Sequence, residues 1–396
     1  MLNDTHPQRP VTVTGRFRHL DQISAVSAER WYALFGHSYP FINHRFLHAL
    51  ETSDSVSPQL GWTPCHLVLE GADGELLAAC PLYLKAHSYG EFVFDFAWAR
   101  ASEQLGQPYY PRLVNAIPFT PSTGPRWAAV NAEAETLLLK RLSELAAEAG
   151  QSSTHVLFVN EPGAQVAGQH GASLRHDIQY QWFNRGYHDF EGFLARLSSD
   201  KRKKIRRERR KLVDCGIEYR REPAQALGAA ALDEIFALYA STYAMRGQPP
   251  YLNRTFFDHY LAGGESPLWI LSGYSGGQRE MIALFYVGPD ALFGRHWGAR
   301  REIDGAHFET CYYQGIQWCI DLGLQRFDAG TQGDHKRTRG FDPVRTTSAH
   351  WIVDTRLKNA VDHFLARERV AITEHAEWLS SAHSAYKQVP QEGEHG

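Results

Sequence analysis

The chain has 396 residues, 43% of them hydrophobic and 12% aromatic, with a formal net charge of −3. This length exceeds one ordinary hydrophobic core, so we expect two domains, and the composition excludes a largely disordered protein. No apolar run of about 18 residues occurs and the N-terminal residues lack the apolar core of a signal peptide, which excludes a membrane-spanning helix and favours a cytoplasmic protein.

The cysteines agree with that location. They are odd in number and form no CxxC motif: Cys65, Cys80, Cys215, Cys311 and Cys319. We therefore expect reduced, mostly buried thiols. Residues 1–9 and 383–396 are polar at both ends of the chain and are predicted to be flexible tails.

The first half of the chain predicts a short strand, two helices, a hairpin, a strand, a helix and a strand. Phe92, Phe94, Phe96 and Trp98 alternate with smaller residues, which indicates a strand with Asp95 on its other face. The other elements follow from apolar spacing and turn residues: strand Val11–Phe17, helices Ser27–Phe35 and Asn43–Leu50, a hairpin with strands at 66–70 and 76–84, helix Glu133–Ala149 and strand Thr154–Val159.

The second half repeats this order, which predicts two copies of one α/β unit. Its elements are helices Leu232–Met245 and Arg254–Leu261, a hairpin of 268–271 with 281–287, strand Ala291–Trp297, helix His307–Leu322 and strand Leu324–Asp328, followed by a last helix Leu357–Leu379. We place one domain at 10–175 and the second at 186–380. The first copy carries an additional segment, Lys85–Arg112.

A basic helix is predicted to open the second domain. Between Lys201 and Lys211, nine of eleven side chains are basic and only Glu208 is acidic, so this segment carries +8 within a chain of −3. Ile205 and Leu212 lie two helical turns apart and would face the core. Repulsion between the cations favours an anionic partner such as nucleic acid. The candidate contacts are Lys201, Arg202, Lys203, Lys204, Arg206, Arg207 and Arg210. A solvated charged face is the alternative.

The densest polar cluster follows the last strand of the second copy, from Asp328 to Phe341. Loops at the carboxyl ends of strands line the ligand crevice of α/β folds. Lys336, Arg337 and Arg339 could hold a phosphate or a developing oxyanion, and His335 could take a proton from an attacking amine. A polar surface loop is the alternative.

Further candidates for substrate binding lie just before this cluster. Arg295 and Trp297 share one face of their strand, and His307, Glu309 and Tyr312 open the following helix. Tyr110, in the additional segment of the first copy, completes the set. His307, His335 and Glu309 have no spacing typical of a metal site, so we expect no metal.

One motif is absent. Acetyltransferases that use CoA grip its pyrophosphate with a Gly-rich turn before their long helix. Neither 123–128 nor 301–306 contains such a turn. The sequence therefore disfavours CoA without excluding it.

Several segments together resemble the Fem-like N-acyltransferases of the GNAT superfamily, bacterial proteins of peptidoglycan biosynthesis or recognition. They are HSYGEFVFD (87–95), PFTPSTGPR (118–126), the basic run 197–211, HFETCYYQG (307–315) and GDHKR (333–337). The resemblance implies an α/β (α+β) fold with tandem GNAT-like domains, each a mixed, mostly antiparallel sheet flanked by helices. It also implies an enzyme with a lysine after the last strand, here Lys336.

Fem-type relatives move an aminoacyl group from aminoacyl-tRNA to an amine on a cell-wall precursor. For this chain the resemblance implies Lys336 as the oxyanion-stabilising group, His335 or Asp95 as the base, and Arg295, Arg337 and Arg339 as anchors for an anionic acceptor. The chain would need no cofactor, with aminoacyl-tRNA or acyl-CoA as co-substrate. It lacks a coiled-coil arm and adds 85–112, which leaves two alternatives: a CoA-dependent N-acetyltransferase, and a non-catalytic module that recognises the cell wall or nucleic acid.

Overall fold

The structure, a computed structural model, describes residues 13–331, 333–381 and 384–387. Its strands are β1 (Arg16–Leu20), β2 (Trp62–Pro64), β3 (His66–Glu70), β4 (Leu76–Cys80), β5 (Tyr83–Lys85), β6 (Arg112–Asn115), β7 (Ala128–Ala129), β8 (Ser153–Val159), β9 (Ser173–Phe183), β10 (Glu218–Pro223), β11 (Leu268–Ser275), β12 (Gln278–Val287), β13 (Ala291–Ala299), β14 (Arg326–Asp328) and β15 (Asp342–Ile352). An eleven-stranded mixed sheet has the order β10-β11-β12-β13-β14-β9-β15-β8-β6-β5-β2, and a smaller sheet has the order β1-β3-β4-β7.

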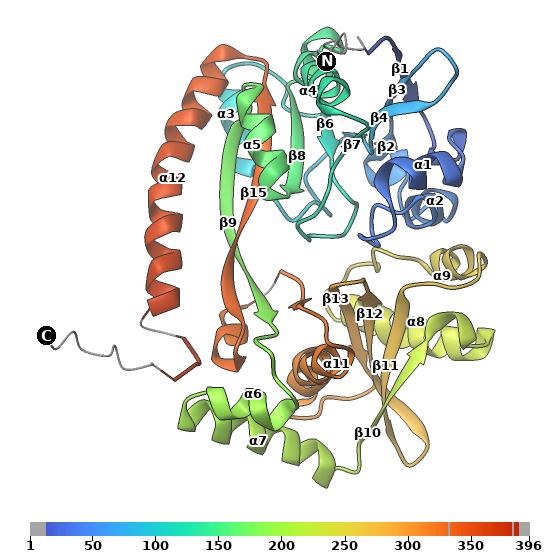
Figure 1. The fold of residues 1–396 in the computed structure, drawn as a ribbon, viewed down its shortest axis with the longest axis vertical. Helices are drawn as coiled ribbons and strands as arrows, with labels where there is room; N and C mark the ends of the chain where they lie inside the picture. The colour runs from blue at the N-terminus through green and yellow to red at the C-terminus, as the bar shows by residue number, and fades with distance from the viewer. Residues whose placement is uncertain (1–12, 332, 382–383, 388–396) are drawn as a thin grey trace, which may run out of the picture.

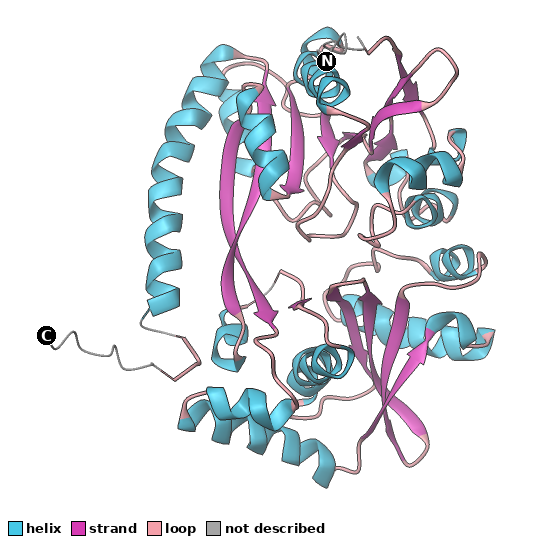
Figure 2. Ribbon diagram, in the orientation of Figure 1, coloured by secondary structure: helices cyan, strands magenta, loops and turns pink. Residues whose placement is uncertain are grey.

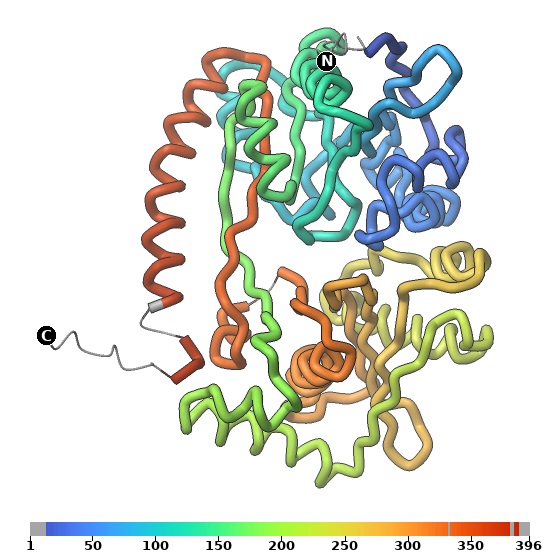
Figure 3. Tube along the Cα trace, viewed as in Figure 1, coloured from blue at the N-terminus to red at the C-terminus, as the bar shows by residue number. Residues whose placement is uncertain are grey.

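The two halves exchange their last long strands. β9 follows the first half in sequence but pairs with β14 of the second half, and β15 follows the second half but pairs with β8 of the first. β9 and β15 also pair with each other over most of their length. Figures 1 and 3 show both strands spanning the molecule between the first half at the top and the second half at the bottom, in opposite directions. The large sheet is therefore continuous across both halves.

Helices cover the sheets (Figure 2). They are α1 (Ala28–Phe35), α2 (His44–Thr52), α3 (Phe96–Gln104), α4 (Ala132–Glu148), α5 (Glu161–Gln169), α6 (Phe190–Arg196), α7 (Ser199–Asp214), α8 (Ala229–Ala244), α9 (Arg254–Leu261), α10 (Ala306–Phe308), α11 (Gln314–Leu322) and α12 (Thr355–Ser381). α12 lies along β9 and β15, and α8 packs on β13. That second contact requires Gly298, because a Cβ there would collide with the Leu238 carbonyl of α8. No described helix has the length and apolar character needed to cross a bilayer.

The largest hydrophobic core belongs to both halves. Phe41 of the first half packs its ring 4.8 Å from Tyr286 and 5.3 Å from Phe293 of the second. Phe46 on α2 lies against Phe256 on α9 in the same way. Aromatic pairs at these distances add to the burial energy, so the halves are joined by core packing as well as by strand pairing.

Most predicted elements are present within a few residues of their expected bounds. The strand predicted at 92–98 is wrong, because Phe92 has a left-handed backbone (φ 63°) and α3 begins at Phe96. Only Trp98 of the four aromatic residues is buried, on α3. The helix predicted from His307 is interrupted by a π-helical turn at 309–313, labelled η4.

The segment between the two predicted domains is not a linker. Residues 176–185 form most of β9 at the centre of the sheet. At the other end, Tyr386 pairs with Leu197 in an isolated bridge, although the sequence places it in a flexible tail. Ala385 is buried, and Ala385 and Lys387 form backbone hydrogen bonds with Ser198 and Arg196, so the flexible-tail prediction is wrong for 384–387. Residues 1–9, 383 and 388–396 of the predicted tails lie outside those described.

Candidate active site

A cavity of about 560 Å³ opens where β13 and β14 part. Their parallel pairing ends at Phe293 and Asp328. β13 continues to Ala299, while the chain after Asp328 turns away through Gly330. The pairing of β12 with β13 also shifts at this point, which leaves Arg295 as an extra, bulged residue of β13. Bulges beside active sites redirect a side chain, and Arg295 lines this cavity.

Among the aromatic side chains that line the cavity, one group comes from both halves: Phe92, Phe94, Phe119, Tyr243 and Tyr251. The Phe119 and Tyr251 rings stack at 4.7 Å, and Phe92 and Tyr243 each meet Tyr251 edge-on. We call Phe92, Phe119, Tyr243 and Tyr251 the aromatic wall.

Arg295 is held by a buried ion pair. Its Nη2 lies 3.1 Å from a carboxylate oxygen of Asp328, and both side chains are almost fully buried. Ser122 of the first half donates a hydrogen bond of 2.7 Å to the same carboxylate. Burial raises the pKa of Asp328, but the Arg295 charge together with hydrogen bonds from Arg295, Ser122 and the Gly330 N–H outweighs this and holds the pKa below its usual value. The Arg295 Nε–H has no partner among the described residues.

Lys336 lies directly behind the cavity. It is 1% exposed, and its ammonium donates a hydrogen bond to the carbonyl oxygen of Gly330, a cavity-lining residue. Burial lowers the pKa of Lys336 to about 8, opposed by the nearby charge of Asp328. The group is therefore mostly protonated at neutral pH while remaining close to deprotonation.

Imidazoles gather in the same cavity. The His335 Nε2 lies 2.8 Å from the Tyr312 hydroxyl, and the His307 ring meets both Trp297 and Tyr312 edge-on. Burial, followed by the charges of Arg339 and Lys336, lowers the pKa of His335. Burial also lowers the pKa of His307 to about 4. Both imidazoles are neutral at pH 7, so each can accept a proton.

The structure thus brings together Lys336, His335, Arg295, Trp297, His307 and Tyr312 of the predicted site. Three neighbours point elsewhere. Glu309 is buried in an ion pair with Arg209 of the basic helix, at 3.2 Å. Arg337 lies over the Trp378 ring of α12, 5.5 Å from its centroid. Arg339 is buried, ion-paired with Glu208 at 2.8 Å. None of the three lines the cavity.

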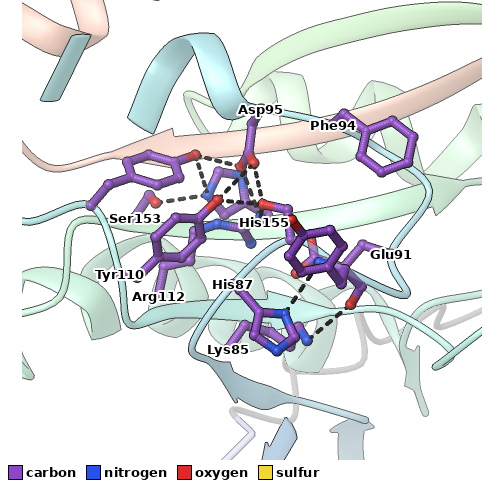
Figure 4. A network of polar contacts seen from close by, with 12 residues as sticks. Lys85, His87, Glu91, Phe94, Asp95, Tyr110, Arg112, Ser153 and His155 are labelled. Carbon is purple, nitrogen blue, oxygen red and sulfur yellow. Dashed lines mark hydrogen bonds and ion pairs between the residues drawn. The ribbon is translucent and has the colours of Figure 1, made fainter. Parts of the chain in front are cut away.

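Asp95 and Tyr110 belong to a different cluster, drawn in Figure 4. The Asp95 carboxylate accepts hydrogen bonds from Ser88 and from Tyr109 (2.6 Å), and it lies 2.8 Å from Arg112. Tyr110 shares the Ser88 hydroxyl at 2.6 Å. The Asp95 carboxylate is engaged by these partners and does not line the cavity. Asp95 is therefore not placed to assist His335.

The basic helix α7 lies beside the loop that carries Lys336. Glu208 on α7 pairs with Arg339 and accepts a hydrogen bond from Tyr313. Part of the predicted anionic-partner surface is already engaged: Lys204 lies 4.0 Å from Glu208, Arg206 pairs with Glu191, and Arg202 bonds the Leu197 carbonyl. Within the described part of the chain, no ion pair engages the others: Lys201, Lys203, Arg207 and Arg210.

Sequence reasoning missed several lining residues. Phe119 and Pro121 lie in PFTPSTGPR, a segment noted only for its resemblance. Gln179 lies on β9, in the stretch assigned to a domain boundary. Tyr251 follows two prolines with no polar motif near it. The pairing of β9 with the second half and the core shared by both halves bring these residues together, and no local pattern reveals either contact.

A family described as peptidoglycan biosynthesis/recognition matches residues 22–388. The chain belongs to this FemAB-like family. The predicted resemblance and fold class are confirmed. No curated protein matches the chain.

Solved structures show the same fold at low identity. The C-terminal domain of a putative lysylphosphatidylglycerol synthetase from Agrobacterium fabrum is 9% identical, with 85% of this chain and 95% of that chain covered and a TM-score of 0.54. A conserved protein of unknown function from Bacteroides thetaiotaomicron is 11% identical (84% and 99% covered, TM-score 0.50). FemX is 12% identical (79% and 93% covered, TM-score 0.48). At these identities the likeness to the first two structures shows the fold alone.

Proposed function

We propose that this FemAB-like protein is an N-acyltransferase that moves an activated acyl or aminoacyl group to an amine in the cavity between β13 and β14. One observation carries the proposal. Arg295, a bulged arginine, and His335, a neutral imidazole, line one cavity, and the buried Lys336 lies directly behind it, bonded to the cavity-lining Gly330. Acyl transfer to an amine needs a positive potential for the oxyanion and a base for the amine proton.

The transfer has two steps, addition of the amine and loss of the ester oxygen. The amine nitrogen attacks the ester carbonyl carbon, and the carbonyl electron pair moves to its oxygen. The charges of Lys336 and Arg295 stabilise that oxyanion. The His335 imidazole takes the proton from the attacking nitrogen. When the carbonyl re-forms, the ester oxygen leaves and receives that proton.

The donor we favour is aminoacyl-tRNA, and the acceptor is an amine of a cell-wall precursor. The unpaired cations on α7 support a polyanionic donor, because this helix contacts the loop of Lys336 through Arg339. FemAB-like membership supports the acceptor. An acyl-CoA donor is the second candidate, since a cavity at parting strands also suits a thioester.

A transfer assay tests the proposal. Purified protein is incubated with labelled aminoacyl-tRNA or labelled acetyl-CoA and an amine-bearing muropeptide precursor, and the products are identified by mass spectrometry. We expect Lys336→Ala to lower the rate by about 10²–10³. Lys140→Ala, an exposed lysine on α4, is the matched control and keeps the wild-type rate.

Calorimetric titration separates the donors. Saturable binding of acetyl-CoA without binding of aminoacyl-tRNA would replace our donor by CoA. A Lys336→Ala protein that retains full turnover would remove the catalytic assignment. If the wild-type protein binds muropeptide or tRNA and transfers nothing, the chain is a recognition module.

A further inference from the structure

The aromatic wall is built at a conformational cost. Phe92 and Phe119 both have left-handed backbones, with φ of 63° and 57°. Aromatic residues rarely adopt this region, and such strain persists where the surrounding structure enforces it, often at ligand sites. Both rings meet Tyr251, and both line the cavity. The strain therefore holds two large rings against one face of the cavity.

Phe94 adds an open apolar surface beside this wall. Phe94 lines the cavity yet is 54% exposed, and among the described residues its ring stacks only on Phe96, itself 38% exposed. A phenylalanine in this position gains free energy when a ligand covers it. The ring lies two residues from Phe92 in the additional segment of the first copy.

The polar part of the cavity holds an unpaired donor and an unpaired acceptor. Arg295 Nε–H and Gln179 Oε1 are both buried and have no hydrogen-bond partner among the described residues. Gln179 lies on β9 two residues beyond the pairing of Gln181 with Asp328, and Arg295 lies on β13 two residues beyond the pairing of Phe293 with Asp328. The two side chains therefore flank the exit of β14. Unpaired buried groups are costly, so a ligand that satisfies both is favoured.

From these features we infer that the cavity selects a donor whose acyl or aminoacyl group carries a large apolar or aromatic side chain. The side chain packs on the aromatic wall and Phe94. The Arg295 Nε–H donates to the carbonyl oxygen of the transferred group. Gln179 Oε1 accepts a hydrogen bond from its α-amino group when the donor is aminoacylated. Donors with a glycyl or acetyl group leave the wall and Phe94 uncovered. The inference rests on the proposed function and assigns its substrate class.

Binding of stable donor analogues tests the inference without turnover. The probes are 3′-aminoacylamino-3′-deoxyadenosines carrying phenylalanyl or glycyl, together with octanoyl-CoA and acetyl-CoA. Dissociation constants are measured by calorimetry on the full chain. In whichever class binds, we expect the larger group to bind at least tenfold tighter. Phe94→Ala should reduce this preference at least fivefold, and Phe94→Leu should retain most of it.

Tyr89→Ala is the matched control, because Tyr89 is an exposed aromatic residue of the same segment that does not line the cavity. It should keep the wild-type preference. Equal affinities for large and small groups, or tighter binding of the small ones, would overturn the inference and leave the proposed function standing. If the preference for the larger acyl group is kept in both Phe94→Ala and Tyr251→Ala, the aromatic wall and Phe94 do not bind that group. Binding of none of the four probes would overturn both.

Discussion

Lys336 shows how one buried residue couples the fold to the proposed chemistry. Burial lowers its pKa to about 8, and the mechanism needs its ammonium. We therefore expect kcat/KM to fall as pH rises through about 8, because deprotonation removes the charge that stabilises the oxyanion. Lys336→Arg keeps a charge at every accessible pH and should abolish this alkaline fall, whatever its rate. A pH–rate profile of both proteins measures the effect, and an unchanged alkaline limb in Lys336→Arg would contradict it.

His335 should set the acid limb of the same profile. As a base it must be neutral, and burial with the nearby Arg339 and Lys336 charges lowers its pKa below 6.5. Activity should thus rise with pH below 6.5 and level off near neutrality. His335→Asn should lower the rate by about 10²–10⁴ and remove this limb. The control is His188→Asn, a fully solvent-accessible histidine before α6, which should leave the profile unchanged.

The Arg295–Asp328 pair predicts a stability effect separate from catalysis. Asp328→Asn leaves the buried guanidinium without its counter-charge, so the free energy of unfolding should fall by about 3–5 kcal/mol at pH 7. The folded pKa of Asp328 lies below its usual 3.8, so the pair stabilises the protein above pH 3.8 and this contribution is lost as pH falls through the folded value. In denaturant titrations, the difference in unfolding free energy between Asp328→Asn and the wild type should be smaller at pH 3 than at pH 7. Asp73→Asn, in an exposed turn, should change stability little.

At the scale of elements, α7 is a basic helix with two kinds of cation. Some pair with acids of other segments and fix the helix beside the loop of Lys336. Lys203, Arg207 and Arg210 recur at helical spacing opposite Ile205, and none has an ion-pair partner in the described chain. This division explains why a run of nine cations is compatible with a packed helix. It also indicates which cations are free for a polyanion.

Reversing two of these free charges should weaken tRNA binding. In Lys203→Glu/Arg210→Glu we expect weaker binding and a shallower salt dependence, with the slope of log K against log[salt] reduced by about 1.5 if both residues contact phosphates. Arg16→Glu/Lys140→Glu reverses two exposed cations of the first half and serves as the control. Filter binding over a salt series gives the slopes. Equal slopes in the two double variants would show that α7 does not contact tRNA.

The sequence predicts elements that depend on local residue patterns better than those that depend on contacts between distant segments. Amphipathic spacing and capping residues predict α4 and α9 closely, because those elements are defined by local patterns. Both hairpins are present, but the strand predicted at 76–84 is divided into β4 and β5 of different sheets, and the strand predicted at 268–271 extends to Ser275. The strand predicted from the aromatic alternation at 92–98 is wrong, because Phe92 has a left-handed backbone and the rings lie in a loop and on a helix. The loop after β14 was predicted as a site because its charges are consecutive. Gln179 and Tyr251 were missed because their meeting depends on long-range pairing.

The whole molecule behaves as two similar units that complete each other. β8 of the first half lies between β6 and β15, and β14 of the second lies between β13 and β9. Without the exchanged strands, each of these two strands would expose an unpaired edge. Residues of both halves line the cavity, and Ser122 of the first half donates a hydrogen bond to Asp328 of the second. The site therefore exists only when both halves are folded together.

This interdependence predicts a single cooperative unfolding transition. The shared aromatic core and the exchanged strands mean that unfolding one half exposes an edge and a core face of the other, so neither half should be stable alone. Leu138→Ala, which opens a cavity under α4 in the first half, should cost about 2–5 kcal/mol. Hydrogen exchange should then show the loss equally in amides of β8 and of β12, although β12 lies in the second half. Scanning calorimetry of the wild type should give one peak whose calorimetric and van't Hoff enthalpies agree. Two resolved peaks, or protection lost in β8 but retained in β12, would show instead that the halves unfold independently. The strand exchange would then couple their unfolding only weakly.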